Sequence, residues 1–224
     1  MEISFSFHKL KSSPLLVRTV PFAIFAILTV LQGQFHDPAP YWIYALKTAV
    51  AACLLWLLRQ EISEMRWKFS GEAILVGIAV FAAWVGLDGL YPMMFRRQES
   101  FNPARTFGQG SALSLFFIAV RMIGASIVVP MLEEVFYRSF LYRYFIHPQF
   151  WKIPLNRFNW RAFLIIGVIF GVGHFEWLPG ILCAFAYQTL VCRNNRLGDA
   201  ISAHATTNIL LSCWVVIGDN YIFW

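Results

Sequence analysis

Charged residues are scarce in this sequence. Lys, Arg, Asp and Glu make up 13% of its 224 residues, whereas hydrophobic residues make up 58%. Soluble globular domains carry about 25% charged residues, so a chain this poor in charge has too little polar surface to cover itself in water. The composition excludes an ordinary soluble domain and predicts a protein whose exterior faces lipid.

Several motifs that mark other protein classes are also missing. There is no HExxH zinc-protease motif, no Gly-rich phosphate loop, no evident internal repeat and no low-complexity tract. The four cysteines form no CxxC pair and lie in or beside apolar runs, which is typical of buried reduced thiols. The net charge of +6 comes mostly from Lys and Arg between apolar runs, and membrane topology explains this distribution better than nucleic-acid binding does.

Apolar runs extend from about residue 15 to the C-terminus with no soluble block between them. A helix needs about 20 residues to cross the hydrocarbon core. We therefore predict an all-α fold, a polytopic transmembrane helical bundle, as a single integral membrane domain over residues 1–224. The expected helical segments are 15–31, 41–58, 72–91, 111–145, 161–175, 178–192 and 198–217. The first is expected to be an uncleaved span, because no small-x-small cleavage site follows it.

The segment 111–145 decides the number of spans, because it is 35 residues long and contains Pro130. It is either one kinked span or two short helices, which gives seven spans or eight. Seven spans with the N-terminus inside place twelve basic residues inside and three outside, as the positive-inside rule requires. The inside residues are Lys9, Lys11, Arg18, Arg59, Arg66, Lys68, Arg143, Lys152, Arg157, Arg161, Arg193 and Arg196, and the outside ones are Arg96, Arg97 and Arg105. We predict seven spans, with the C-terminus outside.

Charged residues within spans usually mark function, and the densest group is Glu133, Glu134 and Arg138. Glu134 and Arg138 are four residues apart and share one helix face, so they can neutralise each other. Glu133 points about 100° away from Glu134 and is free to face a cavity. Asp88 and Arg121 also fall within spans, where we expect a structural pair. On its own the Glu-Glu-Arg group could equally be a helix-packing device.

Two later apolar segments carry further polar residues. His174 follows Gly171 and Gly173, and these glycines let another helix or a substrate backbone come close. His204 and Asn208 are four residues apart on one helix face, so both can donate hydrogen bonds to one oxygen, as an oxyanion hole requires. Each motif alone could be an interhelical hydrogen bond. Counted along the predicted spans, all these groups fall about 10–20 Å deep in the inner half of the membrane, which favours one shared site.

In this order the motifs resemble those of the CAAX protease and bacteriocin-processing (CPBP, or ABI) family of intramembrane glutamic endopeptidases. The family pattern EExxxR, FxxxH and HxxxN is filled by Glu133-Glu134 with Arg138, by Phe170 with His174, and by His204 with Asn208. The resemblance covers about residues 111–217, expected to form the catalytic core. Residues 84–92 and 101–103 look like the exosortase-associated subgroup.

The resemblance implies that Glu133 and His174 activate a water that attacks the scissile carbonyl, while His204 and Asn208 stabilise the oxyanion. Glu134 and Arg138 would support the site or hold the substrate. It implies no metal or other cofactor, a membrane-associated peptide or protein as substrate, and no nucleic-acid partner. The expected location is the inner membrane of a bacterium. Prenylated substrates are not implied.

Two alternatives stay open at this point. Glu133, His174 and His204 could instead hold a zinc ion in a three-ligand metalloprotease site. Intramembrane carboxylates and histidines also serve proton relays, so a non-enzymatic peptide-binding or transport protein is the other possibility. Against it, no inverted repeat or pair of broken helices is visible.

Overall fold

The computed structural model describes residues 9–94 and 101–224 and contains only helices, turns and irregular segments there, with no strand. The all-α prediction is thus confirmed for these residues. The principal helices are α2 (Pro14–Gln32), α3 (Ala39–Leu58), α4 (Gly71–Gly86), α9 (Trp160–Val172), α10 (Trp177–Asn194) and α11 (Leu197–Gly218). Short helices are α5 (Pro103–Phe107), η3 (Phe150–Lys152) and η4 (Tyr221–Phe223). Arg96 and Arg97, which the charge count assigns to the outside, fall beyond the described residues.

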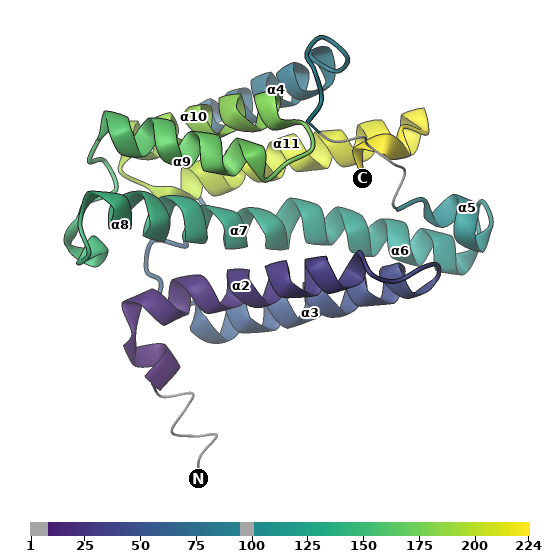
Figure 1. Ribbon diagram of the computed structural model, residues 1–224, viewed down its shortest axis with the longest axis horizontal. Coiled ribbons are helices and arrows are strands. Elements are labelled where there is room, and N and C mark those ends of the chain that lie inside the picture. The colour runs from purple at the N-terminus through teal and green to yellow at the C-terminus, as the bar shows by residue number, and fades with distance from the viewer. Residues whose placement is uncertain (1–8, 95–100) are drawn as a thin grey trace.

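One long helical rod runs through the middle of the molecule (Figure 1). It is continuous over 35 residues, Ala112–Ile146, so the segment around Pro130 is one rod and not two separate helices. Its parts are α6 (Ala112–Ile123), the π-helix η1 (Gly124–Val128), α7 (Val129–Glu134), the π-helix η2 (Val135–Leu141) and α8 (Tyr142–Ile146).

The remaining helices pack on both sides of this rod. The hairpin α2–α3 lies along one side, and α4, α9, α10 and α11 form a layer on the other (Figure 1). α11 packs against α4, α10, η1 and α7, so polar residues of α11 can meet those of α7. The glutamates of the rod therefore lie where two layers of the bundle meet.

In the part of the chain that the structure describes, four helices are long and apolar enough to cross a membrane: Pro14–Gln32, Ala39–Leu58, Ala112–Ile146 and Leu197–Gly218. Gly71–Gly86 and Trp160–Val172 are apolar but shorter. Each of the seven expected segments contains a helix. The count of seven or eight spans is not confirmed, because among the described helices only these four meet the length and composition required. Several long apolar helices indicate a multi-pass integral membrane protein.

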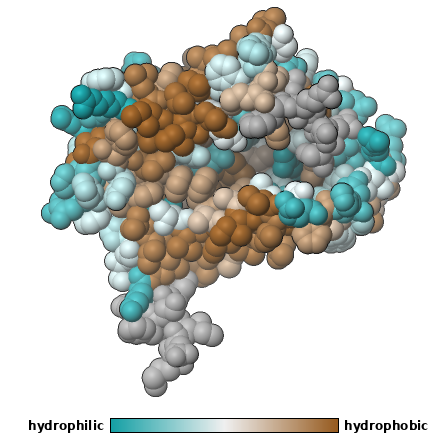
Figure 2. Space-filling model, viewed as in Figure 1, coloured by the Kyte–Doolittle hydropathy of each residue, from teal (hydrophilic) through white to brown (hydrophobic). Residues whose placement is uncertain are grey.

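The surface agrees with a lipid environment. Figure 2 shows hydrophobic residues over the middle of this face and hydrophilic ones at its two ends, where the helices begin and end. Large apolar side chains stand exposed on the outer helices, among them Val30 at 68%, Leu75 at 68% and Ile217 at 86%. In water such a surface would aggregate, so its natural solvent is lipid.

A buried polar cluster ties the α2–α3 hairpin to the long rod. The Arg18 guanidinium of α2 donates to Glu64 in the α3–α4 loop at 2.6 Å and to the Ser139 hydroxyl of η2 at 2.9 Å. Arg143 of α8 donates to the same Glu64 oxygen at 2.8 Å. Burial alone would raise the pKa of Glu64, but the charge of Arg18 and the hydrogen bonds from Ser139 and Arg18 lower it from 4.5 to about 2. We call these four residues the Glu64 cluster.

The expected pair between Asp88 and Arg121 stays a prediction. The contacts that the structure describes for Arg121 are aromatic, because its guanidinium lies over the ring of Tyr44 at 4.6 Å and over that of Phe101 at 5.2 Å. Cation–π contacts of this kind stabilise a partly buried cation without a carboxylate. Arg121 is therefore explained by aromatic packing.

Candidate active site

The rod changes its hydrogen-bond register just before the glutamates. In η1 the Val129 N–H donates to the Gly124 carbonyl, five residues back, so the Ala125 carbonyl would require the N–H of residue 130. That residue is Pro130, which has no N–H. The Asn208 side chain supplies the missing donor, because its Nδ2 lies 2.7 Å from the Ala125 oxygen. Pro130 and η1 thus fix where Asn208 sits relative to the glutamates.

Glu134 is the fully buried centre of the polar group. Its Oε2 lies 3.1 Å from Arg138 Nε, and the two side chains are 0% and 2% exposed. Its other oxygen lies 2.9 Å from His204 Nδ1. Because the carboxylate accepts and does not donate, His204 carries its proton on Nδ1. The expected Glu134–Arg138 pair is present, and it also orients His204.

Glu133 faces the other nitrogen of the same imidazole. Its Oε2 lies 3.9 Å from His204 Nε2, and its side chain is 17% exposed. Within the described residues, this Oε2 atom is buried and has no hydrogen-bond partner. Burying a carboxylate oxygen without a donor is costly, so Glu133 presents an unused acceptor next to the imidazole.

The charges of this group nearly cancel. Two carboxylates and one guanidinium sum to −1 when His204 is neutral and to zero when one more proton is bound. A buried net charge is expensive, and the Arg138 guanidinium beside Glu134 reduces that cost. Glu133 Oε2 and His204 Nε2 lie 3.9 Å apart, so the two groups are close enough to face the same small reactant.

His174 lies on the turn between α9 and α10. Its Nδ1 is 2.8 Å from the Phe170 carbonyl, an acceptor, so the proton is on Nδ1 and Nε2 carries a lone pair. The ring packs against Phe170 at 4.7 Å and Trp84 at 5.6 Å. Gly171 permits this hairpin, because a Cβ there would meet the Trp177 carbonyl oxygen at 2.7 Å. The role of that glycine is helix packing.

Phe170 connects the two parts of the site. Its ring lies 4.4 Å from Arg138 Cζ, 4.7 Å from the His174 ring and 6.3 Å from the His204 ring. No hydrogen bond or ion pair joins His174 directly to Glu133 within residues 9–94 and 101–224. The structure thus brings Glu133, Glu134, Arg138 and His204 together, sets His174 across Phe170 and places Asn208 one turn along α11.

Sequence reasoning missed two neighbours of the site. The buried Tyr187 ring lies 5.3 Å from the His204 ring, and its hydroxyl is 2.6 Å from that of Thr207. Trp84 of α4 packs against His174. The only signal in the sequence was an aromatic residue in an apolar run, and interfacial aromatic belts produce the same signal.

The zinc alternative requires three ligand side chains close enough together to hold one metal ion. Within the described ranges, no group of three or more His, Cys, Asp and Glu side chains is arranged to hold a metal ion. His174 and His204 both pack against the Phe170 ring, with ring centroids 4.7 and 6.3 Å away.

The comparisons with known proteins bear on the same region. Residues 114–210 match the family model described as type II CAAX prenyl endopeptidase Rce1-like. No curated protein and no solved structure matches the chain. The matched range contains all six polar motif positions and does not reach residues 84–92 or 101–103, so it gives no support to the exosortase-associated subgroup.

The matched range covers the elements that carry the candidate site residues. It takes in most of the long rod, α9, α10 with the turn between them and nearly two-thirds of α11, and these hold Glu133, Glu134, Arg138, His174, His204 and Asn208. The family is a peptidase family, and peptidases act on peptide or protein substrates. Residues 114–210 are thus similar to the Rce1-like CAAX endopeptidases, and the chain is a membrane CAAX protease-like hydrolase.

Proposed function

We propose that this chain is an intramembrane glutamic endopeptidase that hydrolyses a peptide bond of a membrane-associated substrate. The observation that carries the proposal is the buried array Glu133–His204–Glu134–Arg138, with distances of 3.9, 2.9 and 3.1 Å. It combines an unused carboxylate acceptor with an oriented imidazole inside a peptidase domain. The catalytic core would be residues 111–217 within one membrane domain of residues 1–224.

In the proposed reaction Glu133 is the general base. Its free Oε2 accepts a proton from a water, whose oxygen attacks the scissile carbonyl, and the proton later passes to the leaving amine as the C–N bond breaks. His174 orients the water through the lone pair on Nε2. These steps consume one water, release two peptide ends and require no other reactant.

The tetrahedral intermediate needs donors for its oxyanion. His204 can donate from Nε2 as an imidazolium, since its Nδ1 proton is held by Glu134 at 2.9 Å and that cation is stabilised by Glu134. Asn208 has a second Nδ2 proton besides the one given to Ala125. Arg138 orients Glu134 through Nε at 3.1 Å.

The experiment is a proteolysis assay in detergent with a panel of membrane-tethered peptides. Cleavage by the wild type is expected to persist in strong chelator and to fall by about 10²–10⁴ in Glu133→Ala and in His174→Ala. Glu61→Ala, at an exposed position of the α3–α4 loop, is the control. If both site variants cleave at the wild-type rate, the mechanism is wrong, and loss of activity in chelator would favour the zinc alternative.

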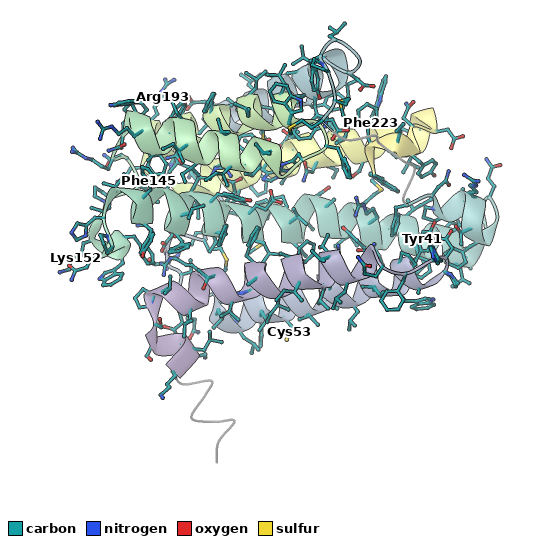
Figure 3. All side chains as sticks on the ribbon, viewed as in Figure 1. Tyr41, Cys53, Phe145, Lys152, Arg193 and Phe223 are labelled. Atoms are coloured by element: carbon teal, nitrogen blue, oxygen red, sulfur yellow. The ribbon has the colours of Figure 1, made fainter. Side chains whose placement is uncertain are left out.

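The proposed topology has seven spans, with the N-terminus inside and the C-terminus outside. Phe145, Lys152 and Arg193 lie at one end of the bundle and Tyr41 and Phe223 at the other (Figure 3). This grouping supports the positive-inside count, because the basic loops share one end. The bacterial inner membrane stays a prediction that rests on the resemblance alone.

Thiol labelling tests this topology. The test uses a chain whose four native cysteines are replaced by Ala. Gln34→Cys then adds one exposed thiol between α2 and α3, and Lys152→Cys adds one exposed thiol between α8 and α9. A membrane-impermeant maleimide added to intact cells is expected to label position 34 and to reach position 152 only after lysis. Labelling of position 152 on intact cells would reverse the orientation.

A further inference from the structure

Arg138 has more hydrogen-bond donors than the site uses. Its Nε faces Glu134 at 3.1 Å, but Nη1 and Nη2 are buried and have no hydrogen-bond partner within the described residues. The Phe170 ring lies 4.4 Å from Arg138 Cζ and can stabilise the face of the guanidinium. The N–H groups point outward in its plane, so stacking does not satisfy them.

Leaving these donors unpaired would be costly. Each buried donor without an acceptor costs about 1–3 kcal/mol, and more for a charged group. Arg138 is 2% exposed and Glu134 is 0% exposed, so bulk water does not compensate them. The fold therefore needs an acceptor next to the Nη atoms.

A small cavity borders this guanidinium on the side of α9 and α10. Its lining includes Arg138, Tyr142, Ala184 and Gln188, and it offers about 10 Å³ to the centre of a water molecule. This volume is at the lower limit for one water. Gln188 is 5% exposed and donates its Nε2 to Cys192 Sγ at 3.3 Å, which leaves its carbonyl oxygen to accept. The cavity thus has the charged Arg138 and the polar Gln188 in its lining and room for a single small ligand.

We propose that one buried water molecule bridges the Nη groups of Arg138 to the side-chain carbonyl of Gln188 and is a fixed part of the site. The water accepts from Nη1 or Nη2 and donates to Gln188. Arg138 and Gln188 act as positioning residues, because they reach His204 only through Glu134. Water is the ligand that matches the cavity size and a cationic donor facing a neutral acceptor.

The consequence for catalysis rests on the proposed function. Arg138 holds Glu134 through Nε alone, so the direction of Nε depends on what the Nη groups bind. If the bridge is lost, the guanidinium turns toward another acceptor, Glu134 loses its ion-pair partner, and His204 loses its orientation. The effect is expected in kcat, with little change in KM, because no member of this bridge contacts substrate.

Ala184 offers a matched pair of variants for the test. Ala184→Val and Ala184→Thr add side chains of nearly equal size to the cavity, so both displace the water, but only Thr returns a hydroxyl to Arg138. The Val variant is expected to have about tenfold lower kcat than the Thr variant and a melting temperature about 4 °C lower. Equal kcat and equal melting temperatures in the two variants would overturn the proposal.

A second variant covers the case in which neither Ala184 variant folds. Gln188→Leu removes the acceptor without filling the cavity, and it is expected to lower kcat about tenfold at unchanged KM. Wild-type kcat and melting temperature in Gln188→Leu count against the bridge. If the wild type cleaves no peptide at all, the proposed function fails, whereas the difference in melting temperature between the Val and Thr variants still tests the water site.

Discussion

Replacing Arg138 with methionine is expected to lower the free energy of unfolding by about 3–5 kcal/mol. Methionine fills a similar volume but leaves Glu134 as a fully buried carboxylate with no cation beside it, since Arg138 is its ion-pair partner at 3.1 Å. Removing one partner of a buried pair costs far more than the net contribution of the pair, because the remaining charge stays desolvated. Chemical unfolding in detergent measures the loss.

Two further variants separate this effect from simple loss of packing. The double variant Glu134→Gln/Arg138→Met removes both charges and is expected to recover most of the stability but none of the activity. Arg193→Met breaks the pair of Arg193 with Glu72, whose side chains are 73% and 35% exposed, and is expected to change stability by less than about 1 kcal/mol. A double variant as unstable as Arg138→Met would show that an unpaired charge is not the cause.

Replacing Glu64 with glutamine is expected to loosen the α2–α3 hairpin from the long rod. The pKa of Glu64 is lowered from 4.5 to about 2, and one pKa unit corresponds to about 1.4 kcal/mol. The carboxylate therefore contributes about 3 kcal/mol near neutral pH. The variant also leaves Arg18 and Arg143 close together without the charge that both contact at 2.6 and 2.8 Å.

The lowered pKa of Glu64 determines how the stability of the fold changes with pH. Because the folded-state pKa is the lower one, the stabilisation is complete above pH 4.5 and is lost as the pH falls toward about 2. The wild type should lose stability over this range, and Glu64→Gln should be less stable at pH 7 and change less on acidification. Unfolding curves from pH 7 to pH 3 test this, with Glu61→Gln at an exposed position of the same loop as the control. If Glu64→Gln and the wild type lose the same stability between pH 7 and pH 3, the result would argue against the Glu64 cluster.

The helices and the main site residues could be predicted from the sequence because both leave strong local signals. Long apolar runs fix the helices within a few residues, as the expected segment 111–145 and the observed rod Ala112–Ile146 illustrate. Glu134 and Arg138 were expected to pair because spacing of four residues places them on one face. The proximity of His204 to both glutamates depends on packing of α11 against α7, and the shared depth of the motifs in the membrane indicated it only indirectly.

Other features depend on contacts that have no signature in a single sequence. Glu64 was one acidic residue in a loop, and nothing local indicated that Arg18, Ser139 and Arg143 would all reach it. The π-helix η1 follows from the combination of Pro130 with a donor from Asn208, 78 residues later in the sequence. Water molecules in small cavities, such as the one beside Arg138, depend on how three helices pack. The segment 72–91 was expected to be longer than α4, Gly71–Gly86, because apolar residues continue into the turn that follows.

The most direct test of the central claim is the single-turnover cleavage rate of Glu133→Gln with a peptide that the wild type cleaves. Glutamine keeps the shape of Glu133 and removes its ability to accept a proton from water. Since Glu133 is partly exposed and holds no ion pair with Arg138, the variant should keep the wild-type melting temperature. A rate lower by about 10²–10⁴ at unchanged stability is the result that we predict. Cleavage at the wild-type rate would show that Glu133 does not activate the water.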